Sequence, residues 1–352
     1  MKSILRSGAV SAAVGVGLSL AVLPTASASA ADGTHVRCND IPGLVKAINK
    51  ANASPNAGRI TLASHCTYTL TEPDNTAAGL PEITGNVTLS GRDTTIRRAP
   101  NAARGFRIFH VVSGGTLTLN SITISGGSLP VGLTAGGGIA VTNGTLNLNG
   151  ARITRNESGV GGGLYNAGGK LNLDGSTVER NAVSSFGGGI FNAGDGTLRM
   201  KGGALLNNRA FAVGGGLHNS SSTAHLNDVA VKGNTAQQGG GILQTTNASL
   251  RMTSSTVSEN IAVTGAGISN TDSSTATLIR SLVTRNTAIN AGGGINNVSS
   301  SQVVLKSSQV VRNRPDNCSP AGSVPGCTNP ASAVTLPAPQ LPPPAKDSKS
   351  RK

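Results

Sequence analysis

The chain has 352 residues and a formal net charge of +14, yet only 12% of its residues are charged, about half the share of roughly 25% in globular proteins. Its 48 glycines, five phenylalanines, two tyrosines and lack of tryptophan exclude a core built from aromatic rings. Apolar residues make up 37% of the chain, which excludes wholesale disorder. Glycines that gather in triplets exclude collagen, which needs one at every third position.

The first thirty residues have the three parts of a secretory signal peptide. Lys2 and Arg6 precede an uncharged stretch, residues 8–23, and a run of Ala and Ser follows at 26–30. A basic start, an apolar middle and an Ala-x-Ala end favour cleavage over a membrane anchor, because the apolar stretch is short. We therefore expect residues 1–30 to be removed and the mature protein to be secreted and extracellular, with no membrane span.

The segment from 31 to 82 is expected to form an N-terminal cap around one short helix. Asp40 can cap the start of a helix over residues 40–52, and Pro42 suits its first turn. The apolar positions of this helix share one face, as in helices that pack against a sheet. They are Leu44, Val45, Ile48 and Ala51.

The cysteines stand two near each end of the chain, at Cys38, Cys66, Cys318 and Cys327. In a secreted protein this even number predicts disulfides, and pairing within each end is favoured among the three possible connectivities. The favoured pairs are Cys38–Cys66 and Cys318–Cys327. A metal site is the rival interpretation, but no Cys-x-x-Cys spacing or adjacent histidine supports it.

A repeat of 25 to 27 residues fills the middle of the chain. Glycine triplets begin at Gly136, Gly161, Gly187, Gly214, Gly239 and Gly292, with a Gly-Ala-Gly variant at Gly265. A ladder with the same period consists of Asn156, Asn181, Asn208, Asn234, Asn260, Asn286 and Asn313. The positions ten, eight and three residues before each of these asparagines are apolar in every copy, a coincidence with odds of ~10⁻⁹ at the background composition.

Each copy predicts three short strands. Two apolar residues spaced two apart begin the copy, a second strand ends near the Asn, and a third of the form Ile/Leu-x-Asn follows the triplet, whose glycines allow a tight left-handed corner. Stacked copies give an all-β fold, a single-stranded right-handed parallel β-helix (a solenoid) over residues 83–315 with about nine rungs and inward asparagines that bond along the axis. A leucine-rich repeat is excluded, because Gly, Ser and Thr disfavour its helix. A disulfide-closed C-terminal cap over 316–328 and a Pro-rich basic tail over 329–352 complete the chain.

These motifs resemble a known group of proteins. The Gly-Gly-Gly-Ile/Leu-x-Asn and Leu-x-Leu pattern, the early Cys-helix-Cys cap and the close at Asp316-Asn317-Cys318 look like the secreted parallel β-helix proteins of the pectin-lyase-like superfamily, of an actinobacterial type. The triplet is also similar to the Gly-Gly-Ala-Ile repeats of polymorphic outer-membrane proteins. The resemblance covers residues 33–328. It implies the fold, whereas the superfamily includes lyases, hydrolases, adhesins and structural rods.

One outward column of the predicted helix is basic. Arg199, His225 and Arg251 take the same place in three consecutive copies, and Lys201 stands beside the first. Because rungs lie about 4.8 Å apart, these side chains would form a stripe for the carboxylates or sulfates of an acidic polysaccharide. In a catalytic version, Lys201 or His225 would take the proton α to a uronate carboxyl. The alternative is a solvated face with an Asp174–Lys201 pair.

Four of the seven aromatic residues fall within residues 165–211, on or near a second outward column. It runs through Tyr165, Phe191 and His218, and Phe186 and Phe211 precede neighbouring triplets. Exposed rings on a sheet suit the apolar faces of sugars, and stacking between rungs is the competing interpretation. A third column beside the Asn ladder is interpreted as solvated corners and includes Arg155, Arg180, Arg285 and Arg312.

The sequence lacks the motifs of the superfamily's best-marked enzymes, the clustered carboxylates of calcium-dependent lyases and the paired aspartates of polygalacturonase-like hydrolases. We therefore favour a secreted, monomeric, non-catalytic protein that binds anionic polysaccharide or a cell-wall polymer, with no cofactor, no metal and no specific nucleic acid partner. One alternative is a calcium-independent polysaccharide lyase acting on uronic-acid-containing glycans. Another is a purely structural or adhesin-like rod.

Overall fold

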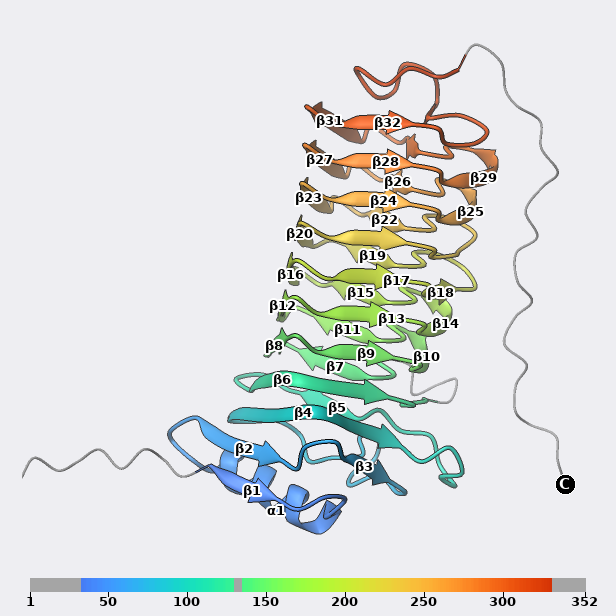
Figure 1. Cartoon of the computed structure of the whole chain (residues 1–352). Helices are drawn as coiled ribbons and strands as arrows, with labels where there is room; N and C mark the ends of the chain where they lie inside the picture. Colours follow the sequence, from blue (N-terminus) through green and yellow to red (C-terminus); the bar gives the residue numbers. More distant parts are fainter. Residues whose placement is uncertain (1–32, 130–134, 331–352) are drawn as a thin grey trace, which may run out of the picture. The chain divides into compact units, whose positions relative to one another are not determined.

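The computed structural model describes residues 33–129 and 135–330. The expected signal peptide, and the expected tail from residue 331 onward, lie outside these described residues. Within them the chain is wound into a parallel β-solenoid, with a single helix, α1 (Ile41–Asn52), at its N-terminal end (Figure 1). No helix in the described ranges is long and apolar enough to cross a membrane.

The first column of strands runs the length of the solenoid. Its strands pair in parallel, each with the next, and β4 and β6 extend into the second column. They are β1 (Thr34–Val36), β2 (Gly58–Leu62), β4 (Asn86–Arg98), β6 (Thr116–Ser125), β8 (Thr145–Asn149), β12 (Lys170–Asp174), β16 (Thr197–Lys201), β20 (Thr223–Asn227), β23 (Ser249–Thr253), β27 (Thr275–Ile279) and β31 (Gln302–Lys306). The expected nine rungs are too few, because β1 and β2 of the N-terminal cap continue this column and bring the number of turns to about eleven.

Two further columns, the second and the fourth that the chain passes in each turn, correspond to the other predicted strands. The second column contains β3 (Thr67–Leu70), β9 (Arg152–Thr154), β13 (Thr177–Glu179), β17 (Ala204–Leu206), β21 (Ala230–Lys232), β24 (Thr256–Ser258), β28 (Leu282–Thr284) and β32 (Gln309–Val311). The fourth column, which follows the glycine triplets, contains β5 (Phe109–Val111), β7 (Ile139–Thr142), β11 (Leu164–Ala167), β15 (Ile190–Ala193), β19 (Leu217–Ser220), β22 (Ile242–Thr245), β26 (Ile268–Asn270), β30 (Ile295–Asn297) and β33 (Cys318–Ser319).

A short third column lies between these two and was not predicted. It consists of β10 (Glu157–Val160), β14 (Ala182–Phe186) and β18 (Arg209–Ala210), and, nearer the C-terminal end, β25 (Ile261–Thr264) and β29 (Thr287–Ala291). Several turns therefore contain four strands, where the repeat predicted three. Small side chains form separate clusters beneath this column, Val183 with Ala210 and Ala236, and Ala262 with Ala266 and Ala288. Such short, Ala- and Ser-rich strands give little apolar periodicity to detect.

The inward side chains of successive turns make one continuous core. The predicted apolar positions are buried, as Leu198 and Leu205 are in one turn, except for Leu305 in the last turn, which is partly buried against the core. The predicted asparagine ladder is buried too, and it is bonded. Asn181 Nδ2 donates to Asn208 Oδ1 at 3.0 Å, and Asn208 Nδ2 donates to Asn234 Oδ1 at 3.0 Å. Each buried amide therefore finds its partner one turn away, as the repeat predicts.

A second buried amide ladder lines the fourth column. Asn166 Nδ2 donates to Asn192 Oδ1 at 2.7 Å, Asn192 Nδ2 to Asn219 Oδ1 at 2.7 Å, and Asn219 Nδ2 to Gln244 Oε1 at 3.1 Å. The ladder is interrupted after Gln244, whose Nε2 is buried without a hydrogen-bond partner, and resumes between two asparagines higher in the column. Two polar columns thus set the stacking register of the core on opposite sides of each glycine triplet.

The three glycines of a triplet are needed for two different reasons. Gly161 adopts a left-handed conformation with φ of 61°, which only a residue without a Cβ adopts readily. A Cβ on Gly162 would lie 2.5 Å from the carbonyl oxygen of Gly188, and one on Gly163 would lie 2.7 Å from that of Gly189. The predicted left-handed corner therefore applies to the first glycine, whereas the other two allow the next turn to approach closely.

Both ends of the solenoid are closed as predicted. Asp40 Oδ1 accepts a hydrogen bond from Gly43 N at 2.9 Å, and α1 packs its apolar side against the first strands. The disulfides Cys38–Cys66 and Cys318–Cys327 are both present. At the other end, Val324 of the disulfide-closed loop is 1% exposed within the main core. This loop therefore covers the last apolar layer of the solenoid.

Candidate ligand groove on the first strand column

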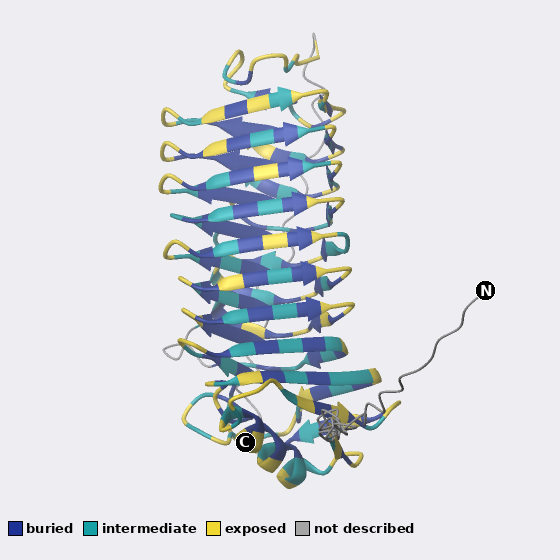
Figure 2. Cartoon of the chain, turned by 90° about the vertical axis from the view of Figure 1, so that its left-hand side faces the viewer, coloured by how far each residue is buried: buried dark blue, intermediate teal, exposed yellow. Residues whose placement is uncertain are grey.

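The predicted basic stripe lies along the outward face of the first column, the side that faces the viewer in Figure 2. Arg199 of β16 pairs with His225 of β20, and His225 pairs with Arg251 of β23, so the three residues stack in consecutive turns. Lys201 lies two residues along β16, and both arginines are exposed. The strand register thus brings together all four residues that the sequence assigned to this site.

An open groove of about 510 Å³ follows the same face toward the N-terminal end. Arg199, Lys201 and His225 line one part of it, and amides, a hydroxyl and one carboxylate line the rest. Arg251 of the stripe lies outside its lining. The other polar residues along it are Thr118, Asn147, Asn149, Asn172, Asp174 and Asn227. The groove therefore combines two cations, Arg199 and Lys201, and one carboxylate, Asp174, with neutral hydrogen-bonding groups along one strand column.

The neutral part of the groove is an ordered amide column. Asn172 Nδ2 donates to Asn147 Oδ1 at 2.9 Å, and Asn147 Nδ2 donates to Thr118 Oγ1 at 3.2 Å. Because these side chains bond to one another across turns, their remaining donors and acceptors are held in fixed directions. A ligand that runs along the groove would meet a repeated pattern of polar groups.

His225 is the titratable centre of the stripe. Partial burial lowers its pKa from the ordinary value, and the positive charges of Arg199 and Arg251 lower it further. The imidazole is therefore neutral at pH 7, and the permanent charges around it belong to the arginines and Lys201. Asp174 is the register partner of Lys201 on the neighbouring strand, but the two do not form an ion pair. The lysine ammonium is thus left available to a ligand.

The predicted aromatic column lies in the fourth strand column, and its residues are less exposed than we expected. Tyr165 stacks on Phe191 with ring centroids 5.8 Å apart, and Phe191 contacts His218 at 4.9 Å. The two rings are half-buried and His218 is buried. Phe186 packs against Phe191 and His218 and remains 41% exposed. The side chains pack on one another between turns, and they lie on β11, β15 and β19, apart from the groove (Figure 1).

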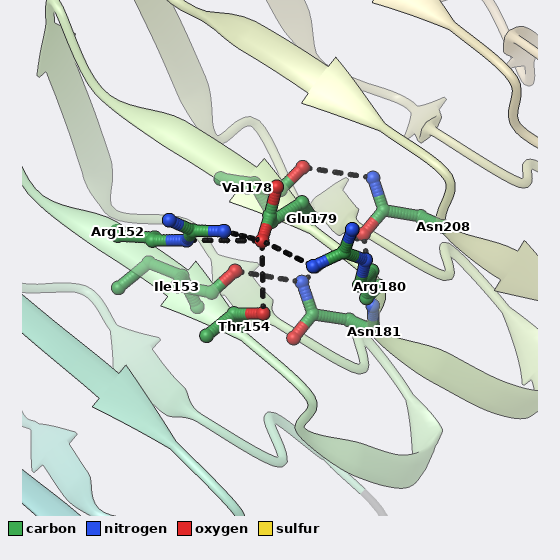
Figure 3. A network of polar contacts seen from close by, with 8 residues as sticks. All are labelled: Arg152, Ile153, Thr154, Val178, Glu179, Arg180, Asn181 and Asn208. Atoms are coloured by element: carbon green, nitrogen blue, oxygen red, sulfur yellow. Dashed lines mark hydrogen bonds and ion pairs between the residues drawn. The ribbon is translucent and has the colours of Figure 1, made fainter.

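A buried carboxylate on the second column was missed by the sequence interpretation (Figure 3). Glu179 accepts hydrogen bonds at Oε1 from Arg152 Nε at 2.9 Å, from Arg152 Nη2 and from Thr154 Oγ1 at 3.3 Å, and Arg180 Nη1 lies 3.6 Å away. Its side chain is only 8% exposed. A signal was available, because Arg152 precedes Glu179 by 27 residues, close to one repeat. In this cluster one carboxylate is shared by Arg152, which the sequence interpretation did not consider, and Arg180, which it placed at a solvated corner.

No three His, Cys, Asp or Glu side chains converge on a possible metal position in the two described ranges. Compared with models of known protein families, the chain matches none, and no curated protein matches it in sequence. The fold therefore defines the class of this protein, a parallel β-solenoid with disulfide-closed ends.

Proposed function

We propose that this protein is secreted, belongs to the pectin-lyase-like superfamily and binds an anionic polysaccharide without catalysis, through the groove on the first column. The observation that carries this proposal is the stacking of Arg199, His225 and Arg251 in consecutive turns beside Lys201. The signal-peptide pattern and the two disulfides support export, because disulfides persist in oxidising compartments. The triplet and Leu-x-Leu motifs support the superfamily.

The chemistry of the groove suits a charged sugar polymer. Guanidinium groups bind carboxylates and sulfates through paired hydrogen bonds, and Arg199 and Arg251 stand two turns apart, about 10 Å along the axis. The amide column through Asn147 and Asn172 offers donors and acceptors to sugar hydroxyls. A repeated site of this kind fits a ligand whose charges and hydroxyls also repeat.

The test is binding of the Arg199→Ala, Arg251→Ala double variant to pectate, alginate and heparin in pull-down and calorimetry. We expect affinity to fall by at least about tenfold, equivalent to about 1.4 kcal/mol. The matched control is Arg37→Ala with Arg104→Ala, two exposed arginines that do not line the groove and whose loss changes the net charge equally. Equal losses in both variants would indicate attraction by net charge alone. Unchanged binding in the groove variant would refute the site.

A second function, lyase action on uronic-acid-containing glycans without calcium, is favoured by the state of His225. A neutral imidazole between two guanidiniums can take the proton α to a carboxylate that the arginines neutralise. The ultraviolet absorbance of unsaturated products, measured with pectate, alginate and hyaluronan, separates the two functions. Product formation that His225→Gln abolishes would replace the binding proposal. If neither binding nor unsaturated products were found, both functions would be refuted, and a purely structural or adhesin-like rod would be the remaining interpretation.

A further inference from the structure

A second polar pocket lies at the C-terminal end of the solenoid, where the second column passes into the third. Its volume is about 530 Å³. Three arginines, Arg285, Arg312 and Arg314, line it together with Thr287. It follows β28 and precedes β29, on a different side of the solenoid from β16, β20 and β23 (Figure 1). The pocket is therefore separate from the groove.

The strand register fixes how these four residues face one another. Arg285 N donates to the carbonyl oxygen of Arg312 at 3.2 Å, so these two arginines lie in adjacent turns. Thr287 pairs in parallel with Arg314, two residues further along the same turns. Neighbouring turns lie about 4.8 Å apart. Three guanidiniums and one hydroxyl thus project from a compact set of four positions.

The backbone that carries the arginines is held by the buried asparagine ladder. Asn286, between Arg285 and Thr287, donates from both N and Nδ2 to Asn313 Oδ1, each at 3.0 Å. Asn313, between Arg312 and Arg314, donates in turn to the carbonyl oxygen of Val283 at 3.0 Å. A site on a backbone pinned in this way loses little conformational entropy when a ligand binds.

The positive charge of this pocket is not neutralised. None of the three arginines forms an ion pair in the described part of the chain. Two acids at neighbouring positions have other partners. Asp316, two residues after Arg314, accepts at Oδ1 from Gly293 N at 2.9 Å, and Glu259, at the column position of Arg285 one turn earlier, pairs with Lys232 at 3.1 Å.

The equivalent place lower in the solenoid shows the contrast. There the single carboxylate of Glu179 lies between Arg152 and Arg180, of which only Arg180 has the same column position as Arg285 and Arg312 (Figure 3). The C-terminal pocket has arginines at that column position in two adjacent turns, and no carboxylate of the described residues forms an ion pair with them.

We propose that this pocket binds a tetrahedral oxyanion, the phosphate or sulfate group of a modified sugar. A carboxylate has two oxygens, which one arginine can satisfy through two parallel hydrogen bonds. Three guanidiniums and the Thr287 hydroxyl offer more donors than that, and a phosphate or sulfate has the three or four oxygens to accept them. The volume of about 530 Å³ leaves room for the sugar that carries the group.

The test is calorimetric titration of the purified full-length protein with inorganic phosphate, inorganic sulfate and acetate. We expect phosphate and sulfate to compete for one site and acetate to bind at least about tenfold more weakly. Glucose 6-phosphate and glucose 6-sulfate then distinguish the two sources of the anion. No saturable binding of either inorganic anion at millimolar concentration would overturn the proposal.

Variants locate the site. Arg312→Gln and Arg314→Gln are each expected to weaken binding by at least about tenfold, and Arg314→Lys, which keeps the charge but loses the paired donors, by less. Thermal unfolding verifies that each variant folds. Arg199→Gln with Arg251→Gln should bind phosphate normally, so failure of the groove proposal and failure of this one are distinguishable. Equal phosphate binding by wild type and both Arg→Gln variants would place the site elsewhere and refute the pocket.

Discussion

At the scale of single residues, His218 is a buried histidine with one unsatisfied ring nitrogen. It is 6% exposed, its Nε2 contacts Thr245 Oγ1 at 3.0 Å, and its buried Nδ1 has no hydrogen-bond partner. Burial lowers the pKa of His218 from 6.5 to about 4. The folded protein therefore holds a neutral imidazole against Phe186 and Phe191, where an imidazolium would lack both water and a counter-charge.

The lowered pKa of His218 predicts that protonation of this side chain destabilises the folded protein at acidic pH. Because the pKa is lower in the folded than in the unfolded state, the stability that depends on a neutral His218 is present above pH 6.5 and is lost as the pH falls toward 4. At pH 5 the loss is about 2 kcal/mol. His218→Leu, which copies the buried Leu243 of the next turn, should remove that loss. Denaturant unfolding at pH 7 and pH 5 measures it, and an unchanged pH dependence in the variant would contradict the assignment.

At the scale of structural elements, the buried asparagine ladder joins strands that are weak individually. Asn208 shows the pattern, because its Nδ2 donates to Val178 O at 2.9 Å and to Asn234 Oδ1, while its Oδ1 accepts from the backbone and side chain of Asn181. The side chain of Asn208 makes four hydrogen bonds to the two adjacent turns and so links its own turn to both neighbours. The half-buried column through Asn147 and Asn172 also bonds from turn to turn, on the outward face of the solenoid.

Replacing one asparagine in each ladder should show how much more a fully buried amide contributes to stability than a half-buried one. Asn208→Ala leaves buried donors and acceptors on both neighbours without partners, at about 1–3 kcal/mol for each unsatisfied group. We expect a total loss of about 3 kcal/mol or more. Asn172→Ala, the control on the groove face, should cost less than about 1 kcal/mol, since water replaces its partners. Thermal unfolding compares them, and similar losses would show that the buried ladder has no special role.

The same elements show what the sequence could predict. The apolar positions and the Asn208 ladder were predictable because each recurs at a fixed spacing with one type of side chain. The second ladder escaped prediction because Gln244 interrupts its asparagine pattern, although its longer side chain still accepts from Asn219. The exposure of the aromatic column was overestimated for a different reason. The alternation of inward and outward residues along a strand predicts the direction of a side chain, but it does not predict which neighbouring side chains cover it. His218 alternates outward, yet Phe186 and Thr245 enclose it.

At the scale of the whole molecule, the solenoid depends on its closed ends. Every internal turn is covered by the turns above and below it, whereas the first and last turns have one open side. Strands β1 and β2 were not recognised as turns because residues 31–82 do not follow the repeat. The Cys38–Cys66 bond ties α1 to these strands, and the Cys318–Cys327 bond holds the loop that carries Val324.

The two disulfides should contribute unequally. Their sequence separations are 28 and 9 residues, and loop-closure entropy gives about 3.6 and about 2.6 kcal/mol respectively. Cys38→Ser with Cys66→Ser should therefore lower the unfolding temperature more than Cys318→Ser with Cys327→Ser. Reductant should destabilise the wild type by the combined amount and leave a variant that lacks all four cysteines unchanged. The reverse order of the two double variants would show that end packing outweighs chain entropy.

The uniform stacking of the turns makes length an adjustable property of this protein. Arg251 of the groove and Arg285 of the C-terminal pocket belong to consecutive turns, and their axial separation is a whole number of steps of about 4.8 Å. Duplicating one 26-residue copy between them would lengthen that separation by one step and leave both sets of side chains intact. The number of repeats would therefore set the distance between the two proposed anion-binding sites.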